Sequence, residues 1–181
     1  MLAALALNWP FLLIRAGLGV IAGIGILVWP ELEPTGLALI FGAYAFSDGV
    51  LALVLALSAR DVAGFGSLLT EAVTRTILGL MIVASPAASA AKLVDIFTAW
   101  AFLTGISAFL IALALRREVS GEWPLPTAGV ISLMYGITLR LAPPPPSVFP
   151  LIIGGHSVLV GLTVLALTLR LRQMSSDIAG H

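Results

Sequence analysis

The sequence predicts an all-α integral membrane bundle of six transmembrane helices, built as three pseudo-repeated helical hairpins. The 181 residues are 60% hydrophobic and only 10% charged, whereas soluble domains carry roughly 25% charged residues. The mean hydropathy is +1.11. The apolar residues form six continuous stretches, each near the ~20 residues that cross a bilayer as a helix. Strands of a membrane barrel alternate in polarity and are shorter, so the continuous stretches favour helices.

The six expected spans follow one another with short connections, at 9–29, 36–58, 68–85, 93–115, 124–141 and 149–170. They form a single membrane domain over residues 1–172, with hairpins at about 8–60, 66–117 and 123–172. A short polar tail follows at 173–181. The N-terminus lacks the basic region of a signal peptide, so we expect the first span to be retained.

The connections differ in composition on the two sides of the bundle. Three of them, near residues 29–36, 85–89 and 142–146, contain proline, which stops a helix because its ring clashes and its N–H is missing. The side with both termini holds five arginines, whereas the other side holds Lys92 and Arg140. Positive residues favour cytoplasmic loops, so we expect both termini in the cytoplasm and a multi-pass protein of the plasma (inner) membrane. The five arginines are Arg60, Arg116, Arg117, Arg170 and Arg172.

Composition and motifs argue against several classes of protein. The formal net charge is zero and there is no cysteine, which excludes a disulfide-stapled domain and a nucleic-acid binder. Gly17, Gly19 and Ala22 fit the dinucleotide-binding pattern G-x-G-x-x-A, but that fingerprint needs a preceding strand, which a continuous helix does not provide. No acid–base or nucleophilic constellation is recognisable. We therefore expect no enzyme activity, no catalytic residues, no metal site and no cofactor.

An internal repeat of 56 residues relates the spans. Glycines recur at this interval in the second, fourth and sixth spans, and the interval also superposes Tyr44, Trp100 and His156. In the odd spans a glycine stands seven residues before a proline each time. Small residues four apart, as in Gly19 and Gly23, let helix backbones approach closely. We expect helix packing at Gly19, Gly23, Gly49, Gly79, Gly105, Gly136 and Gly161.

Four charges lie at least three residues from the nearest end of an expected span, at depths where an unpaired charge costs several kcal/mol. Arg15 lies roughly 9 Å and Asp48 roughly 15 Å from the cytoplasmic edge at 1.5 Å per residue. Glu71 and Arg75 are four residues apart and share a helix face. We expect these four side chains to form one intramembrane polar cluster. Such a cluster is either a structural clamp between hairpins or a proton-responsive site.

His156 is the one histidine inside a span, since His181 ends the chain. A histidine changes charge near neutral pH, which makes His156 a candidate pH-responsive group. Its repeat equivalents, Tyr44 and Trp100, do not share this property and instead favour ring packing at the position. A single histidine without cysteine does not form a metal site.

The first repeat carries a recognisable pattern, in residues 8–30 (NWPFLLIRAGLGVIAGIGILVWP) and 39–49 (LIFGAYAFSDG). It resembles the HdeD-type repeat: a tryptophan, an Arg-Gly pair, a glycine before a Trp-Pro stop and a Gly-x-Tyr…Asp-Gly helix. The Arg-Gly pair is loosened here to Arg15-Ala16-Gly17. The match is good over about residues 8–60 and fades afterwards, with Thr104 and Val160 at the positions equivalent to Asp48. The resemblance implies an inner-membrane protein with a non-enzymatic role in acid or stress resistance.

Alternative functions remain open at this point. A small-molecule or proton transporter or channel needs a hydrated path, and a membrane scaffold needs only a surface that recruits a partner. The lipid bilayer is the one partner that composition implies, and no protein partner is identifiable. Because small-residue faces recur in all three hairpins, we expect a homo-oligomer.

Overall fold

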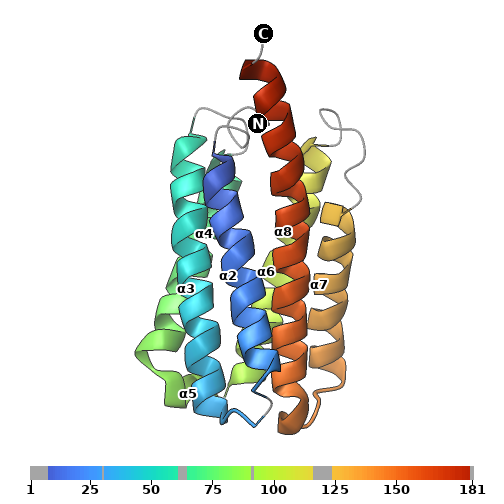
Figure 1. Cartoon of the computed structure of the whole chain (residues 1–181). Coiled ribbons are helices and arrows are strands. Elements are labelled where there is room, and N and C mark those ends of the chain that lie inside the picture. The colour runs from blue at the N-terminus through green and yellow to red at the C-terminus, as the bar shows by residue number, and fades with distance from the viewer. Residues whose placement is uncertain (1–7, 30, 61–64, 91, 116–123, 180–181) are drawn as a thin grey trace.

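A computed structural model describes residues 8–29, 31–60, 65–90, 92–115 and 124–179. This part of the chain is all-helical, with seven α-helices and one 3₁₀ turn and no strand. Six long helices run side by side and alternate in direction, so the first described helix begins and the last one ends at the same end of the bundle (Figure 1). The elements are α2 (Trp9–Leu27), α3 (Pro34–Ser58), α4 (Phe65–Ala84), α5 (Pro86–Ala90), α6 (Leu93–Leu115), α7 (Pro124–Leu141), η1 (Pro146–Val148) and α8 (Phe149–Ala179).

Proline sets several of the helix boundaries. Pro34, Pro86 and Pro124 are the first residues of α3, α5 and α7, where the missing N–H has no helical partner to lose. Pro145 is extended, with φ −64° and ψ 150°, and leads into η1. At the other end of the chain α8 continues to Ala179, so most of the polar tail expected at 173–181 extends this helix.

Four helical segments are long and apolar enough to cross a membrane: Trp9–Leu27, Pro34–Ser58, Leu93–Leu110 and Pro146–Gln173. They correspond to the first, second, fourth and sixth expected spans. The remaining long helices, α4 and α7, coincide with the third and fifth expected spans. Their sequences are more polar, with Glu71 and Arg75 in α4 and Arg140 in the last turn of α7.

The closest helix pairs are α3 with α4, α2 with α8, and α6 with α7. None of these pairs is one of the hairpins expected from the sequence, in which α2 pairs with α3, α4 with α6, and α7 with α8. The close pairs instead join the second helix of one expected repeat to the first helix of the next, and α8 returns to α2. The physical reason lies in the repeated glycines.

Each close helix pair is formed around glycines at equivalent repeat positions. A Cβ atom at Gly79 of α4 would collide with the backbone of Phe46 in α3, and a Cβ atom at Gly49 of α3 would collide with the backbone of Thr76 in α4. Only residues without a side chain permit such an approach. The following contacts repeat the arrangement: Gly105 with Gly129 and Leu133, Gly136 with Phe102, Gly161 with Val20, Gly19 with Gly161, and Gly23 with Gly154 and Val158.

The interior is filled by a layer of rings. Phe41 packs edge-on against Phe97 and Trp100, with ring centroids 5.4 and 5.6 Å apart, and Tyr44 lies 6.1 Å from Trp100. Phe41, Phe97 and Trp100 are at most 1% exposed. Such aromatic pairs contribute about 0.5–1.5 kcal/mol beyond the area that they bury. Residues from α3 and α6, 56 positions apart, thus form the centre of the bundle.

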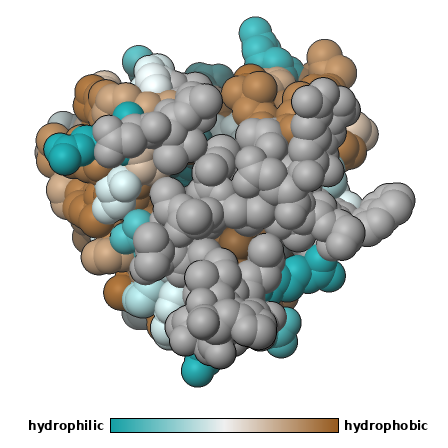
Figure 2. Space-filling view, turned by 90° about the horizontal axis from the view of Figure 1, so that it is seen from above, coloured by the Kyte–Doolittle hydropathy of each residue, from teal (hydrophilic) through white to brown (hydrophobic). Residues whose placement is uncertain are grey.

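The outer surface is rich in large apolar side chains. Ile21 of α2, Met81 of α4 and Leu151 of α8 are at least 65% exposed, and every long helix has similar residues. At the end of the bundle where α2 begins and α8 ends, hydrophobic residues are interspersed with hydrophilic ones (Figure 2). Monomeric soluble proteins rarely expose large apolar patches, so this surface is consistent with burial in lipid.

The glycine contacts predict opposite effects for two substitutions on α2. A Cβ atom at Gly23 would lie 2.7 Å from the carbonyl oxygen of Gly154 in α8, whereas nothing lies within 4 Å of a Cβ atom at Gly25. We expect Gly23→Ala to destabilise the protein by about 1–3 kcal/mol through overpacking. Gly25→Ala, the matched control, removes a helical glycine from open space and stabilises by up to about 1 kcal/mol. Thermal unfolding in mild detergent measures both changes, and equal effects would contradict the close α2–α8 packing.

Candidate functional site

Asp48 lies near the middle of α3 and points into the bundle, with only 4% of its surface exposed. Arg15 of α2 binds it with two hydrogen bonds: Nε donates to Oδ1 at 2.8 Å and Nη2 donates to Oδ2 at 3.0 Å. This bidentate arrangement is the strongest form of an arginine–carboxylate pair. It joins the first two long helices of the chain, as expected from the estimated depths of the two residues.

Arg75 of α4 reaches the same carboxylate from the other side. Its Nη1 donates to Asp48 Oδ2 at 2.7 Å, and its guanidinium lies 4.9 Å from the ring centre of Trp100. Its Nη2 lies 3.5 Å from Thr104 Oγ1 in α6, a long contact. Arg75 can reach Asp48 because Gly49, the next residue in α3, has no side chain. The α3 backbone therefore touches the α4 backbone at Arg75 and Thr76.

Glu71 completes the network from one helical turn before Arg75. Its Oε1 lies 2.8 Å from Arg75 Nε, yet this Nε makes no hydrogen bond with the described residues. The contact is therefore an ion pair without hydrogen-bond alignment. Glu71 and Arg15 keep 15% and 16% of their side-chain surface exposed, whereas Asp48 and Arg75 keep 6% and 5%.

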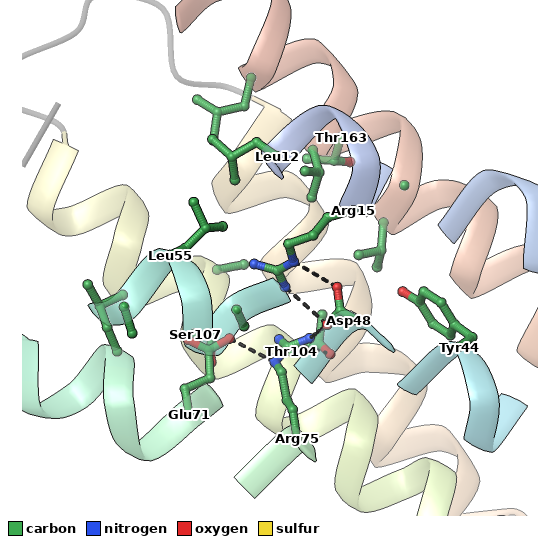
Figure 3. Close-up of a pocket in the computed structure, with 18 of the residues that line it drawn as sticks. Leu12, Arg15, Tyr44, Asp48, Leu55, Glu71, Arg75, Thr104, Ser107 and Thr163 are labelled. Carbon is green, nitrogen blue, oxygen red and sulfur yellow. Dashed lines mark hydrogen bonds and ion pairs between the residues drawn. The ribbon is translucent and has the colours of Figure 1, made fainter. Parts of the chain in front are cut away.

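The network brings together all four charges that the sequence singled out, and their formal charges sum to zero. Figure 3 shows Arg15 and Arg75 converging on Asp48 from different helices, with Thr104 beside them. Removing one partner from such a buried pair leaves an uncompensated charge. The arrangement links α2, α3 and α4 through a single carboxylate.

His156 of α8 lies elsewhere in the interior and is 1% exposed. Its Nε2 shares a hydrogen bond of 3.0 Å with Ser132 Oγ of α7. The ring packs edge-on against Phe97 and Tyr135, with centroids 5.2 and 5.4 Å away. His156 is thus part of the ring layer, as its equivalence to Tyr44 and Trp100 implies.

A cavity of about 120 Å³ lies against the charged network. All four charged residues line it, together with Thr104 and fourteen further residues that Figure 3 draws in part. From the network it extends along Leu12, Leu55 and Leu68 toward the end of the bundle where α2 begins and α8 ends. Helices α2, α3, α4, α6 and α8 contribute to its walls.

Sequence reasoning missed several polar residues near these sites. Thr104 and Ser107 of α6 line the cavity, and Ser132 binds His156. The 56-residue interval places Thr104 at the position of Asp48 and was a usable signal. No pattern along the chain singles out Ser132, because its role depends on the distance between α7 and α8. Across the described residues, no three histidine, aspartate or glutamate side chains gather as metal ligands would.

A bundle of long apolar helices with an apolar exterior and an internally paired set of charges defines a protein of the helical membrane class. The family model described as a short repeat of unknown function (DUF308) matches residues 14–73 and 70–141. The chain belongs to this family. The two matches begin 56 residues apart, at the same interval as the glycines of the sequence repeat. Comparisons with curated proteins and with solved structures found no match.

The network predicts a large effect of Asp48→Asn. The neutral amide cannot balance the charge of two guanidinium groups, so we expect the free energy of unfolding to fall by about 3–5 kcal/mol. The fall is smaller if the guanidinium groups also find partners in the unfolded state within the membrane. Adding Arg15→Gln removes one of the unpaired cations and restores part of the stability. Thermal unfolding in detergent measures both variants.

Asp95→Asn is the matched control for this prediction, since Asp95 is an exposed residue in the first turn of α6. We expect it to change stability far less than Asp48→Asn does. If Asp48→Asn behaves like Asp95→Asn, or if the double variant is less stable than Asp48→Asn alone, Asp48 does not hold the bundle together.

Proposed function

We propose that this protein is a six-span inner-membrane protein of three repeated helix pairs, with a non-enzymatic role in protection against acid stress. The DUF308 match over two repeats supports the repeated architecture. The stress role follows from the resemblance of residues 8–60 to the HdeD-type repeat. All six long helices run the length of the same bundle (Figure 1), which supports a crossing by α4 and α7 as well as by the four more apolar segments.

The charged network is what lets α4 cross a bilayer. Glu71 and Arg75 pair with each other, and Arg75 also pairs with Asp48 of α3. The two charges of α4 thus face protein rather than lipid, which is the usual position of ionisable residues in membrane helices. The side of α4 that carries Val73, Ile77, Leu80 and Met81 is left for lipid, since these side chains are 39–65% exposed.

In this proposal the network is a clamp between the first two repeats. The observation that carries it is the convergence of three charge-assisted hydrogen bonds from α2 and α4 on one carboxylate of α3. A bundle held in this way keeps its packing without a ligand. Its contribution to acid survival is then to remain a folded membrane component.

One observation favours a second candidate, a transporter or channel for protons or small molecules. The cavity touches all four charges and extends toward one end of the bundle. A proton flux through proteoliposomes that contain the purified protein, absent from empty liposomes, would support transport over the clamp. The absence of flux would favour the clamp.

The proposed topology predicts how single cysteines react in this naturally cysteine-free chain. Cysteines that replace Glu33, Ala88 or Ser147 lie in exposed positions at the end of the bundle opposite the termini. We expect an impermeant thiol reagent to label them from outside intact cells. Cysteines in place of Ser58 or Gln173, exposed near the termini, should react only after the membrane is opened. The reverse labelling pattern would overturn the orientation.

The clamp also predicts how the variants behave in cells. In a strain that lacks the gene, we expect the wild-type protein to restore survival after acid shock. The Asp48→Asn/Arg15→Gln double variant, if present in the membrane at the wild-type level, should protect equally well, because a clamp contributes only folding. A folded double variant that fails to protect would show that the charges act directly. Failure of the wild-type protein itself would refute the stress role.

A further inference from the structure

The cavity beside the charged network has two chemically different parts. One part is formed by the charged network with Thr104 and the hydroxyl-bearing Ser107 and Thr163. The other part is a sleeve of aliphatic side chains from α2, α3, α4 and α8. The sleeve residues are Leu12, Leu55, Leu68, Val164 and Leu167. A space with a polar end and an apolar sleeve matches an amphiphile better than it matches water alone, because water needs two to four polar partners each.

The polar end has hydrogen-bonding capacity that the described residues do not use. Arg15 donates hydrogen bonds from Nε and Nη2 to Asp48, and its Nη1 makes no hydrogen bond with the described residues. Glu71 has one oxygen near Arg75 and the other without a described partner. These are also the two charged side chains that retain the larger exposure, 16% and 15%. A ligand in the cavity can therefore accept a hydrogen bond from Arg15 and donate one to Glu71.

The charge of the network restricts the ligand further. Arg15 and Arg75 balance Asp48 and Glu71, so an ion in the cavity would add a charge that nothing around it compensates. A buried charge without a partner is strongly unfavourable. An uncharged head that accepts a hydrogen bond from Arg15 and donates one to Glu71 satisfies both groups and leaves the balance unchanged.

We propose that this cavity binds a small uncharged amphiphile whose head donates and accepts a hydrogen bond, as a primary alkyl amide does, with its alkyl chain among the leucines of the sleeve. A volume of about 120 Å³ is comparable with engineered cavities of about 150 Å³ that take up benzene, so the ligand has only a few carbon atoms. The inference rests on the bundle of the proposed function but not on its role in acid stress.

Saturation-transfer NMR tests the inference on the full chain in lipid nanodiscs, with pentanamide as the probe and empty nanodiscs as the blank. We expect transfer to pentanamide from the wild-type protein. Pentanoate, an anion, and pentylammonium, a cation, have alkyl chains similar to that of pentanamide. Each should bind at least tenfold more weakly than pentanamide does. No transfer to pentanamide above the blank, or equal binding of either ion, would overturn the proposal.

Cavity-filling variants locate the binding site. Val160 and Val164 of α8 line the cavity, and Val160→Phe or Val164→Phe should reduce pentanamide binding at least tenfold. Val130→Phe on α7 is the matched control, because Val130 is 52% exposed on the outer surface, and it should bind as the wild type does. If a folded filling variant binds as well as Val130→Phe, the amphiphile lies outside this cavity. If neither filling variant folds, the proposal is tested by the wild-type protein alone, which should bind pentanamide at least tenfold more tightly than pentanoate or pentylammonium. Acid survival is measured separately, so either proposal can fail without the other.

Discussion

The rest of the structure depends on one carboxylate, Asp48, which accepts hydrogen bonds from two guanidinium groups in the middle of an apolar bundle. Charges in such surroundings must be paired, and the pairing has a geometric consequence. Arg15 and Arg75 come from different helices, so α2 and α4 must both lie against the face of α3 that carries Asp48. Glu71 balances the second arginine, and the interior stays neutral.

Glycine packing and charge pairing support each other. Gly49, the neighbour of Asp48, lets the backbones of α3 and α4 touch at Arg75, and this contact brings the guanidinium within 2.7 Å of the carboxylate. A bulkier residue at Gly49 would separate the helices and stretch the ion pair. Both kinds of contact occur together between α3 and α4, which belong to successive repeats, whereas the close pairs α6–α7 and α2–α8 pack around glycines.

The three repeats share packing positions but differ in chemistry. Asp48 of the first repeat corresponds to Thr104 and Val160, and only the aspartate carries a charge. The DUF308 matches cover residues 14–141, the part that includes the charged network and Thr104. The third repeat contributes His156 and aliphatic walls to the interior instead. A charged network that occurs once among the described residues is suited to one binding or clamping role.

The sequence by itself determined the helical class, the positions of the long helices, the packing glycines and the four charges, because hydropathy, glycine spacing and the cost of buried charge all act along the chain. It did not determine which helices pack most closely. Hydropathy assigns residues to lipid or interior but does not rank neighbours, so the pairing of α2 with α8 came only from the fold. The cavity and the bond between His156 and Ser132 likewise depend on distances between helices, and only tertiary packing sets these.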